Sequence, residues 1–284
     1  MLYLDYYIID NIVMNQISDV IIKNHIALAA FDSVGLDAIK LIAEVEQQEQ
    51  NNEVWLFMAL VSCSTIEITA TIEWLKNIQK QARLVKEPML LVIHLNPCLL
   101  TQSQQRIEFL RALSDFADSV VLVPQLAADS QAQALARLPQ FLINMVFRSG
   151  MISLDFGDLR NRIQHGIAVF GYGLQQPLND GSFEDISAIA EINQQWRNNY
   201  LPPAYVKQIL ACIEGNIDVD LDEYMAIGEQ LQQPQEMFRT AQNMALALGM
   251  SVKEQTESEK KYIGALFFGL DFEAFIPVVD NLEG

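Results

Sequence analysis

The sequence predicts an α/β protein in which a parallel-sheet domain is joined by a central helix to a smaller α+β domain. Three observations predict this class. Short apolar runs alternate with helical patterns through the first half of the chain. A long helical pattern, 129–147, then leads into Ser149–Arg160, a stretch with glycine and a pair of aspartates. Glycine-spaced strands follow it. We therefore expect two domains, 1–148 with the central helix and 149–284.

The first half predicts buried parallel strands joined by crossover helices. Continuous apolar runs bounded by polar residues or proline are typical of such strands. They occur at 26–31, 54–61, 89–95 and 117–123. Helical periodicity lies between them, at 35–50, 66–84 and 102–116. Residues 1–24 mix Tyr, Ile and Asp without a clean period; they could form a strand followed by a helix, and the sequence leaves this open.

The second half predicts the order strand–helix–strand–helix–strand–strand. Strands are expected at 166–174, 205–213 and 262–270, and helices at 183–196 and 221–231. The stretch 237–248 fits either a strand or a helix. The long pattern before this half contains Pro139, which costs about 3 kcal/mol inside a helix or marks a kink or a restart.

Composition excludes several classes of partner. The formal net charge is −18 and the pI is about 4.4, so the chain has no cationic excess for nucleic acid or for an anionic membrane. The longest apolar runs are too short to span a bilayer, and the first residues lack the basic region of a signal peptide. Three widely spaced cysteines indicate free thiols in a reducing compartment. A cytoplasmic protein without a metal site is expected.

Asp155 and Asp158 are candidate functional residues. They are three positions apart, so they share one face if a helix begins near Asp155. One interpretation is that Asp155 caps this helix and Asp158 lies in its first turn. The other is that both carboxylates point outward and act on a water or a cation of another molecule. Spacing alone favours the cap.

The carboxyl ends of the parallel strands offer little for a phosphate. Ligands of such sheets bind at these ends, and glycine lets backbone N–H groups approach a phosphate. Only Gly35 of the thirteen glycines precedes Gly150. Hydroxyls and one carboxylate stand there instead, namely Asp32, Ser33, Ser62, Ser64 and Thr65. The three scattered histidines suggest no ligand set, and His94 is expected to be a satisfied core or edge residue.

Ser149–Arg160, with Asp155 and Asp158, resembles the synergy loop of the bacterial tubulin FtsZ family. The similarity continues through Gly166–Gly173, and it returns at Ile209–Gly228 and Lys261–Gly269. It is specific from residue 149 onward and weak before. The resemblance implies a tubulin/FtsZ-like fold, with a reduced Rossmann-like domain, a central helix and a second α+β domain.

Departures from the family lie in the nucleotide loops. The family's glycine-rich phosphate loop corresponds to residues 61–67, which contain no glycine and include Glu67. The family's base-contacting asparagine falls near Gln133, and the asparagine of its synergy loop is Ser153. We therefore interpret Asp32, Ser33, Gly35, Ser62, Ser64 and Thr65 as the remnant of a nucleotide loop. GTP is not expected as a cofactor.

The resemblance implies that the synergy loop enters the nucleotide pocket of a neighbouring subunit, where its two aspartates help place a water. Ser153, Asp155, Asp158 and Arg160 are the partner-binding candidates. The chain is expected to be a pseudo-GTPase that modulates a tubulin-like filament, so its partner would be a protein, either such a filament or itself. Two alternatives remain: a structural protein that assembles without nucleotide, and a divergent GTPase of cell division.

Overall fold

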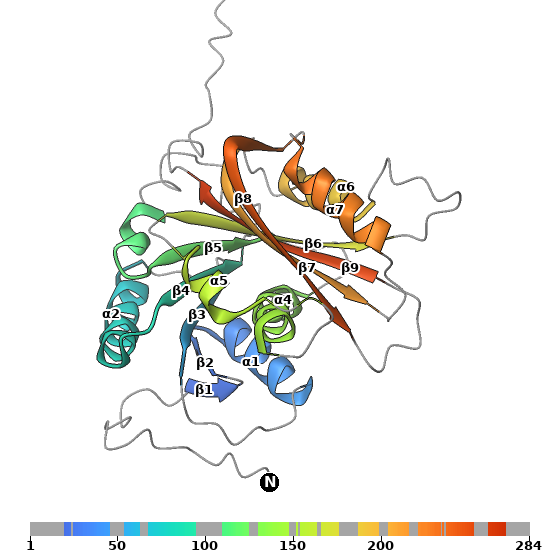
Figure 1. Cartoon of the computed structure of the whole chain (residues 1–284). Helices are drawn as coiled ribbons and strands as arrows, with labels where there is room; N and C mark the ends of the chain where they lie inside the picture. The colour runs from blue at the N-terminus through green and yellow to red at the C-terminus, as the bar shows by residue number, and fades with distance from the viewer. Residues whose placement is uncertain are drawn as a thin grey trace, which may run out of the picture.

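A computed structural model describes residues 20–23, 25–45, 54–62, 68–94, 110–124, 130–147, 152, 154–163, 166–175, 187–198, 204–215, 221–233, 235, 237–252 and 261–270. Within these residues nine strands form one sheet, in the order β1-β2-β3-β4-β5-β6-β9-β7-β8. The architecture is a mixed α/β fold in which parallel neighbours dominate the first part of the sheet (Figure 1).

The parallel part of the sheet contains five strands that run in the same direction. They are β2 (Ile26–Ala30), β3 (Leu56–Ser62), β4 (Met89–His94), β5 (Ser119–Val123) and β6 (Ile167–Gln175). Every residue of β3, β4 and β5 is buried, which explains their continuous apolar sequences. The crossover helices include α1 (Ser33–Val45) and α2 (Ile68–Val85), and residues 110–114 are helical before β5.

The remaining strands complete both ends of the sheet. β1 (Val20–Lys23) pairs antiparallel with β2 at one edge. At the other end, β9 (Lys261–Leu270) lies between β6 and β7 (Ala204–Gly215) and is antiparallel to both. The edge strand β8 (Phe238–Val252) is parallel to β7. The ambiguous stretch 237–248 is therefore mostly strand.

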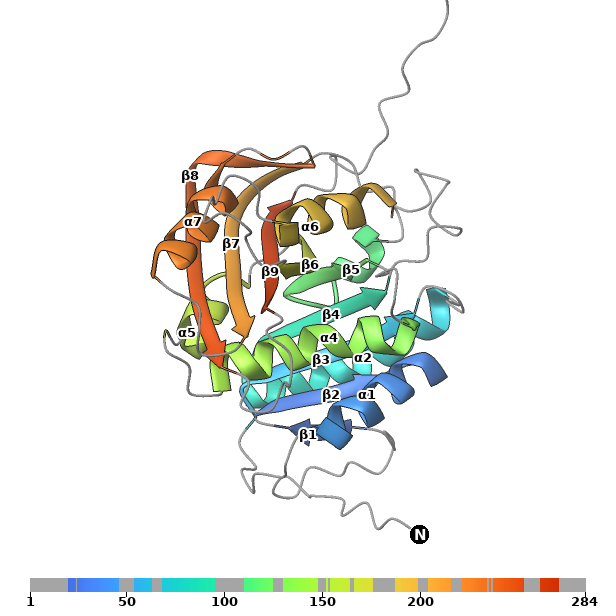
Figure 2. The same ribbon diagram turned by 90° about the vertical axis from the view of Figure 1, so that its right-hand side faces the viewer.

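Helices cover both faces of the sheet. One face carries α1, α4 (Gln131–Leu142) and the short helix α5 (Phe156–Arg160), with one hydrophobic cluster beneath them. The other carries α2, α6 (Ser187–Asn198) and α7 (Leu221–Gln232) over a second cluster. Figure 2 shows α1 and α4 side by side on the first face. Helices on both faces explain why the central strands contain almost no polar residue.

The predicted central helix passes through Pro139 without ending. Pro139 is buried within α4, and the helix changes to a π-helix, η2 (Ile143–Phe147), four residues later. The predicted domains share one sheet, because β5 pairs with β6 from Val120–Ile167 to Leu122–Val169. The division at residue 148 remains a prediction.

Two glycines of β6 are required by close helix packing. A Cβ atom on Gly171 would lie 2.6 Å from Ile192 Cγ2, and one on Gly173 would overlap the backbone oxygen of Ala188. Both contacts come from α6, which crosses β6 at these positions. The Gly-Tyr-Gly pattern therefore brings a helix close to the sheet.

Gly173→Ala is expected to lower the free energy of unfolding by at least about 2 kcal/mol, because the added methyl group meets backbone and not a movable side chain. Chemical denaturation measures this loss. Gly228→Ala in α7 is the control, since its Cβ would find ordinary contacts of 3.5 Å or more. Helix propensity predicts between no change and about 1 kcal/mol of stabilisation there. Equal stability of the two variants would contradict the packing argument.

Candidate functional site

The carboxyl ends of β2, β3 and β4 bring together polar residues from separate parts of the chain. Asp32 follows β2, Ser62 ends β3 and His94 ends β4. Gln131, the first residue of α4, lies beside them, with its Oε1 3.5 Å from Ser62 Oγ. This edge is where ligands of parallel α/β sheets bind.

The Asp32 carboxylate joins two loops of this edge. Its Oδ1 accepts a hydrogen bond from the Gly35 backbone N–H at 2.8 Å, and its Oδ2 accepts one from the Ser62 N–H, also at 2.8 Å. The first bond caps α1 and the second ties α1 to the end of β3. Backbone N–H groups at such strand ends and helix starts are the usual donors to a phosphate. Here the chain's own carboxylate takes two of them, and its charge repels another anion.

Gly35 has a packing role. A Cβ atom at this position would lie 2.9 Å from Ala30 Cβ and 3.1 Å from Leu60 O. The glycine therefore lets α1 approach β2 and β3. Ser33 is the exposed first residue of α1. Ser64 and Thr65 lie outside the described residues.

His94 was expected to be a satisfied core or edge residue; its place in the core is confirmed, whereas its hydrogen bonding is not. Its side chain is fully buried at the end of β4, and among the described residues neither ring nitrogen has a hydrogen-bond partner. Burial lowers the pKa of His94 to about 4, although the nearby Asp32 carboxylate favours the charged form. Ser62, His94 and Asp32 are neighbours at one edge, but without a bond from the imidazole they form no nucleophilic triad.

The two aspartates of α5 cap their own helix. Asp155 is the N-cap: its Oδ1 accepts from the Asp158 N–H at 2.8 Å, and Asp158 Oδ2 accepts from the Asp155 N–H at 3.3 Å. The described structure therefore supports the capping interpretation. Both carboxylates also remain accessible, since Asp155 is exposed and the Asp158 side chain is 41% exposed. Capping does not hide these charges.

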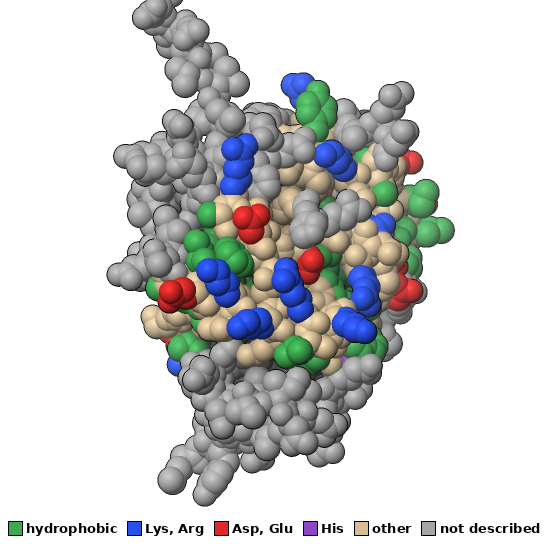
Figure 3. All heavy atoms as spheres, turned by 90° about the vertical axis from the view of Figure 1, so that its left-hand side faces the viewer, with side chains coloured by type: hydrophobic (Ala, Val, Ile, Leu, Met, Phe, Trp, Pro, Cys, Tyr) green, Lys and Arg blue, Asp and Glu red, His purple; other side chains and the backbone are tan. Residues whose placement is uncertain are grey.

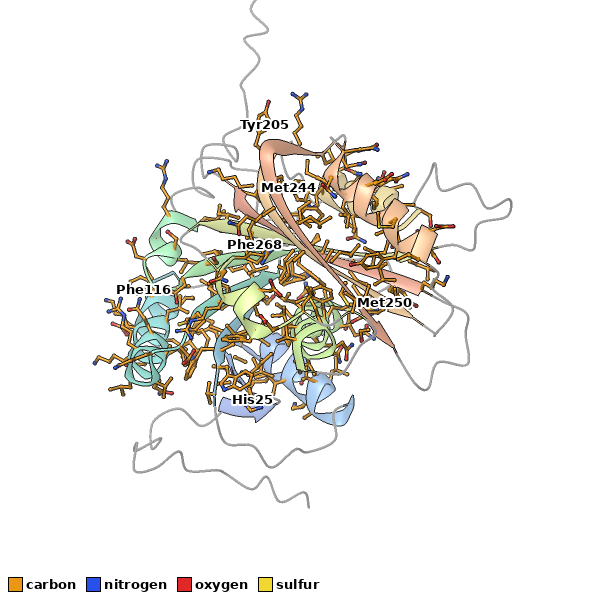
Figure 4. All side chains as sticks on the ribbon, in the orientation of Figure 1. His25, Phe116, Tyr205, Met244, Met250 and Phe268 are labelled. Atoms are coloured by element: carbon orange, nitrogen blue, oxygen red, sulfur yellow. The ribbon has the colours of Figure 1, made fainter. Side chains whose placement is uncertain are left out.

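Contacts of α5 place it where the parallel strands begin, at the opposite ends of the strands from Asp32. Phe156 packs on Trp55, which precedes β3, with 5.8 Å between ring centroids, and Trp55 stacks on His25. Figure 4 shows His25 in the turn between β1 and β2. Arg160 lies 3.4 Å from Glu87 and donates to the Lys86 carbonyl, just before β4. The length of β3 separates the two candidate sites by about 20 Å.

The central helix runs from the carboxyl ends of the parallel strands to the side where these strands begin. α4 begins beside Ser62 with a capping box in which Ser130 accepts from the Gln133 N–H and Gln133 accepts from the Ser130 N–H. The position expected for the family's base contact is thus used for capping. Its far end is η2, and Ile152, a few residues further along the chain, forms a β-bridge with Met250 of β8. One continuous helical segment, α4 followed by η2, therefore spans the distance between the two sites.

A buried hydrogen-bond network that sequence analysis missed fixes the end of this helix. Asn144 of η2 donates to Glu214 Oε1 at 2.9 Å, and Tyr172 donates to Glu214 Oε2 at 2.8 Å. Burial is the main cause that raises the pKa of Tyr172, and Glu214 adds to it. Arg137 lies over the Tyr172 ring. Glu214 stands in an apolar strand run, where the sequence does not reveal a partner.

The remaining predicted residues have mixed outcomes. Arg160 belongs to α5 with the aspartates, whereas Ser153 lies outside the described residues. Within the described ranges, no three His, Cys, Asp or Glu side chains form a possible metal site. Among the described helices, none has both the length and the hydropathy needed to cross a bilayer.

The burial of His94 predicts that the free energy of unfolding falls in acid. The unfolded chain takes up a proton on His94 as the pH falls below its ordinary pKa of 6.5, whereas the folded chain does so only near pH 4. Its contribution to stability is therefore complete above pH 6.5 and falls as the pH drops toward 4, by up to about 3 kcal/mol. His94→Leu should flatten this slope in denaturation curves between pH 7 and pH 5. His25→Asn removes a different imidazole and is the control; an unchanged slope in His94→Leu would contradict the assignment.

Comparisons with known proteins address the fold. No family model matches the sequence, and no curated protein does. An empty FtsZ dimer from M. jannaschii matches at a TM-score of 0.58 and 14% identity, over 86% of this chain and 71% of that one. GDP-form protofilaments of TubZ from Bacillus thuringiensis serovar israelensis match at 0.54 and 12%, over 84% and 68%. The chain therefore has a tubulin/FtsZ-like fold.

Proposed function

We propose that this chain is an FtsZ-like cytoskeletal protein that neither binds nor hydrolyses GTP and that modulates a tubulin-like filament. The observation that carries the proposal is the pair of hydrogen bonds from Gly35 and Ser62 to the Asp32 carboxylate. They engage the backbone donors that a phosphate would need. We place the protein in the cytoplasm and in cell division.

The separation of the two sites supports action on a second molecule. Asp155 and Asp158 lie at the edge where the parallel strands begin, and Asp32, Ser62 and His94 lie where they end. Across the sheet, about 20 Å separates them, so the acids of one chain cannot reach the strand ends of the same chain. Exposed carboxylates at this edge can orient a water only in a neighbouring subunit.

The fold likeness supports a filament subunit as that neighbour. The matching structures are named as a dimer of FtsZ and as protofilaments of TubZ. By this likeness, α5 would face the nucleotide site of the next subunit, and Arg160 would lie at the rim of the contact. A chain with the α5 surface but without a nucleotide site at its strand ends would bind a filament through one face only. Nucleotide-dependent addition of subunits would then stop at this chain.

The first test separates charge from capping at α5. Asn caps helices about as well as Asp, so Asp155→Asn should keep the fold while it removes the carboxylate. The full chain is added to the FtsZ of the same cell, and GTP hydrolysis and polymer length are measured. We expect the wild-type chain to change both, and Asp155→Asn to lose at least about tenfold of the effect on hydrolysis.

Asp222→Asn is the matched control, because Asp222 is an exposed acid in the first turn of another helix, α7. It should behave like the wild-type chain. The proposal fails if the wild-type chain has no effect on FtsZ, or if Asp155→Asn and Asp222→Asn act alike. In that case Asp155 and Asp158 serve only as caps.

The second test addresses nucleotide binding directly. Titration of fluorescent GTP into the full chain at micromolar concentration should give no saturable signal, because Asp32 repels the phosphates and takes the N–H groups of Gly35 and Ser62. The FtsZ of the same cell is the positive control under identical conditions. Saturable micromolar binding would remove the pseudo-GTPase proposal and favour a divergent GTPase.

A further inference from the structure

Cations gather on one face of this acidic chain. We define the basic face as Lys76, Lys80 and Arg83 of α2, Lys86 in the turn after it, and Arg160 of α5. The α2 residues share a helix side, since they are spaced by four and three positions. Arg160 joins them through its hydrogen bond to the Lys86 carbonyl. Figure 3 shows Lys and Arg side chains spread across this side of the molecule.

The basic face holds five of the 18 cations in a chain with 36 acids. Lys76 lies over the Phe116 ring, with its Nζ 5.8 Å from the ring centroid, and Arg160 pairs with Glu87. Figure 4 shows where Phe116 lies. Lys80, Arg83 and Lys86 have no ion pair within the described part of the chain. Like charges at this spacing repel one another, so an acidic group that binds here relieves the repulsion.

An exposed apolar side chain lies among these cations. Leu84 is 65% exposed, follows Arg83 directly and is four positions from Lys80 on the same helix. Few large hydrophobic side chains of the described residues are this exposed. A ligand that matches the basic face would therefore carry both acids and apolar residues, which favours a peptide over a small anion.

Residues 271–284 have this composition. Four of them are acids, Asp271, Glu273, Asp280 and Glu283, and none is Lys, Arg or His. Between the acids stand large apolar residues, namely Phe272, Phe275, Ile276, Val278, Val279 and Leu282. The segment lies outside the described residues and is attached to the end of β9 at Leu270.

The segment is attached at Leu270, which lies on the side of the sheet where the parallel strands begin, as Lys86 and Arg160 do. β9 ends at Leu270, which pairs with Ile167, the first residue of β6. Ile167 pairs with Val120 of β5, and Val120 pairs with Leu91 of β4. Leu91 therefore lies three strands away from Leu270. At about 4.8 Å per strand this is about 14 Å, which places Leu270 about 20 Å from Lys86. An extended segment of this length reaches about 46 Å.

We propose that residues 271–284 bind to the basic face of their own chain. The acids pair with Lys80, Arg83 and Lys86, and one of the aromatic residues covers Leu84. The contact holds the segment near Arg160 and α5, so a partner at α5 would meet a basic face already neutralised by the chain itself. This inference is independent of nucleotide binding.

Photocrosslinking in the full chain tests the contact. The residue p-benzoylphenylalanine replaces Phe275, the sample is irradiated, and crosslinked peptides are identified by mass spectrometry. We expect crosslinks within single molecules to peptides that contain residues 76–86 or 156–160. The yield should fall at least about fivefold between about 0.05 M and about 0.5 M salt, because an exposed ionic contact is screened.

A triple charge reversal, Lys80→Glu, Arg83→Glu and Lys86→Glu, should reduce the crosslink yield as strongly as about 0.5 M salt does. The control, Lys40→Glu, Arg197→Glu and Arg239→Glu, changes the net charge equally at exposed positions of α1, α6 and β8, and should keep the crosslink. The salt series on the unreversed chain remains decisive if a reversal variant does not fold. Crosslinks to other regions, crosslinks only between two molecules, or equal yields from both triple variants would overturn the proposal.

Discussion

The common direction of β2 to β6 is the constraint on which both candidate sites depend. Parallel strands place all their carboxyl ends at one edge and all their beginnings at the other. Asp32, Ser62 and His94 therefore meet at one edge, while α5 packs near Trp55 and Glu87 at the opposite one. α4 and η2 span the distance between them. This geometry keeps α5 away from the strand ends of its own chain, which is why the proposed function assigns it to a second molecule.

At the carboxyl edge, the fold and anion binding compete for the same donors. The two N–H groups bound by Asp32 connect the start of α1 with the end of β3. In the function proposed above, the carboxylate that stabilises this corner also disfavours a phosphate there. His94 adds no attraction for an anion, because a buried imidazole with a lowered pKa carries no positive charge near neutral pH. At α5 there is no such competition, since Asp155 and Asp158 cap the helix and remain accessible.

Sequence analysis predicted the fold where local pattern determines structure. The apolar runs gave β2 to β5, and the fully buried pattern of β4 explains why. The fold class is confirmed. Contacts between distant segments could not be read in this way: β1 beside β2, β6 beside β5, and the partners of Glu214 arise only when the sheet assembles. The paired aspartates were found by spacing, whereas the internal use of Asp32 depends on Ser62, which is 30 positions away.

The reciprocal caps of α5 have a consequence for recognition. Each of the two carboxylates is held by the backbone of the other residue, so their mutual orientation is fixed when the helix forms. A flexible acidic loop would lose conformational freedom on contact with a neighbour, and that loss would weaken association. In this chain the ordering occurs during folding. The two charges would therefore arrive as a preassembled pair, which lowers the entropic cost of binding a surface that fits them.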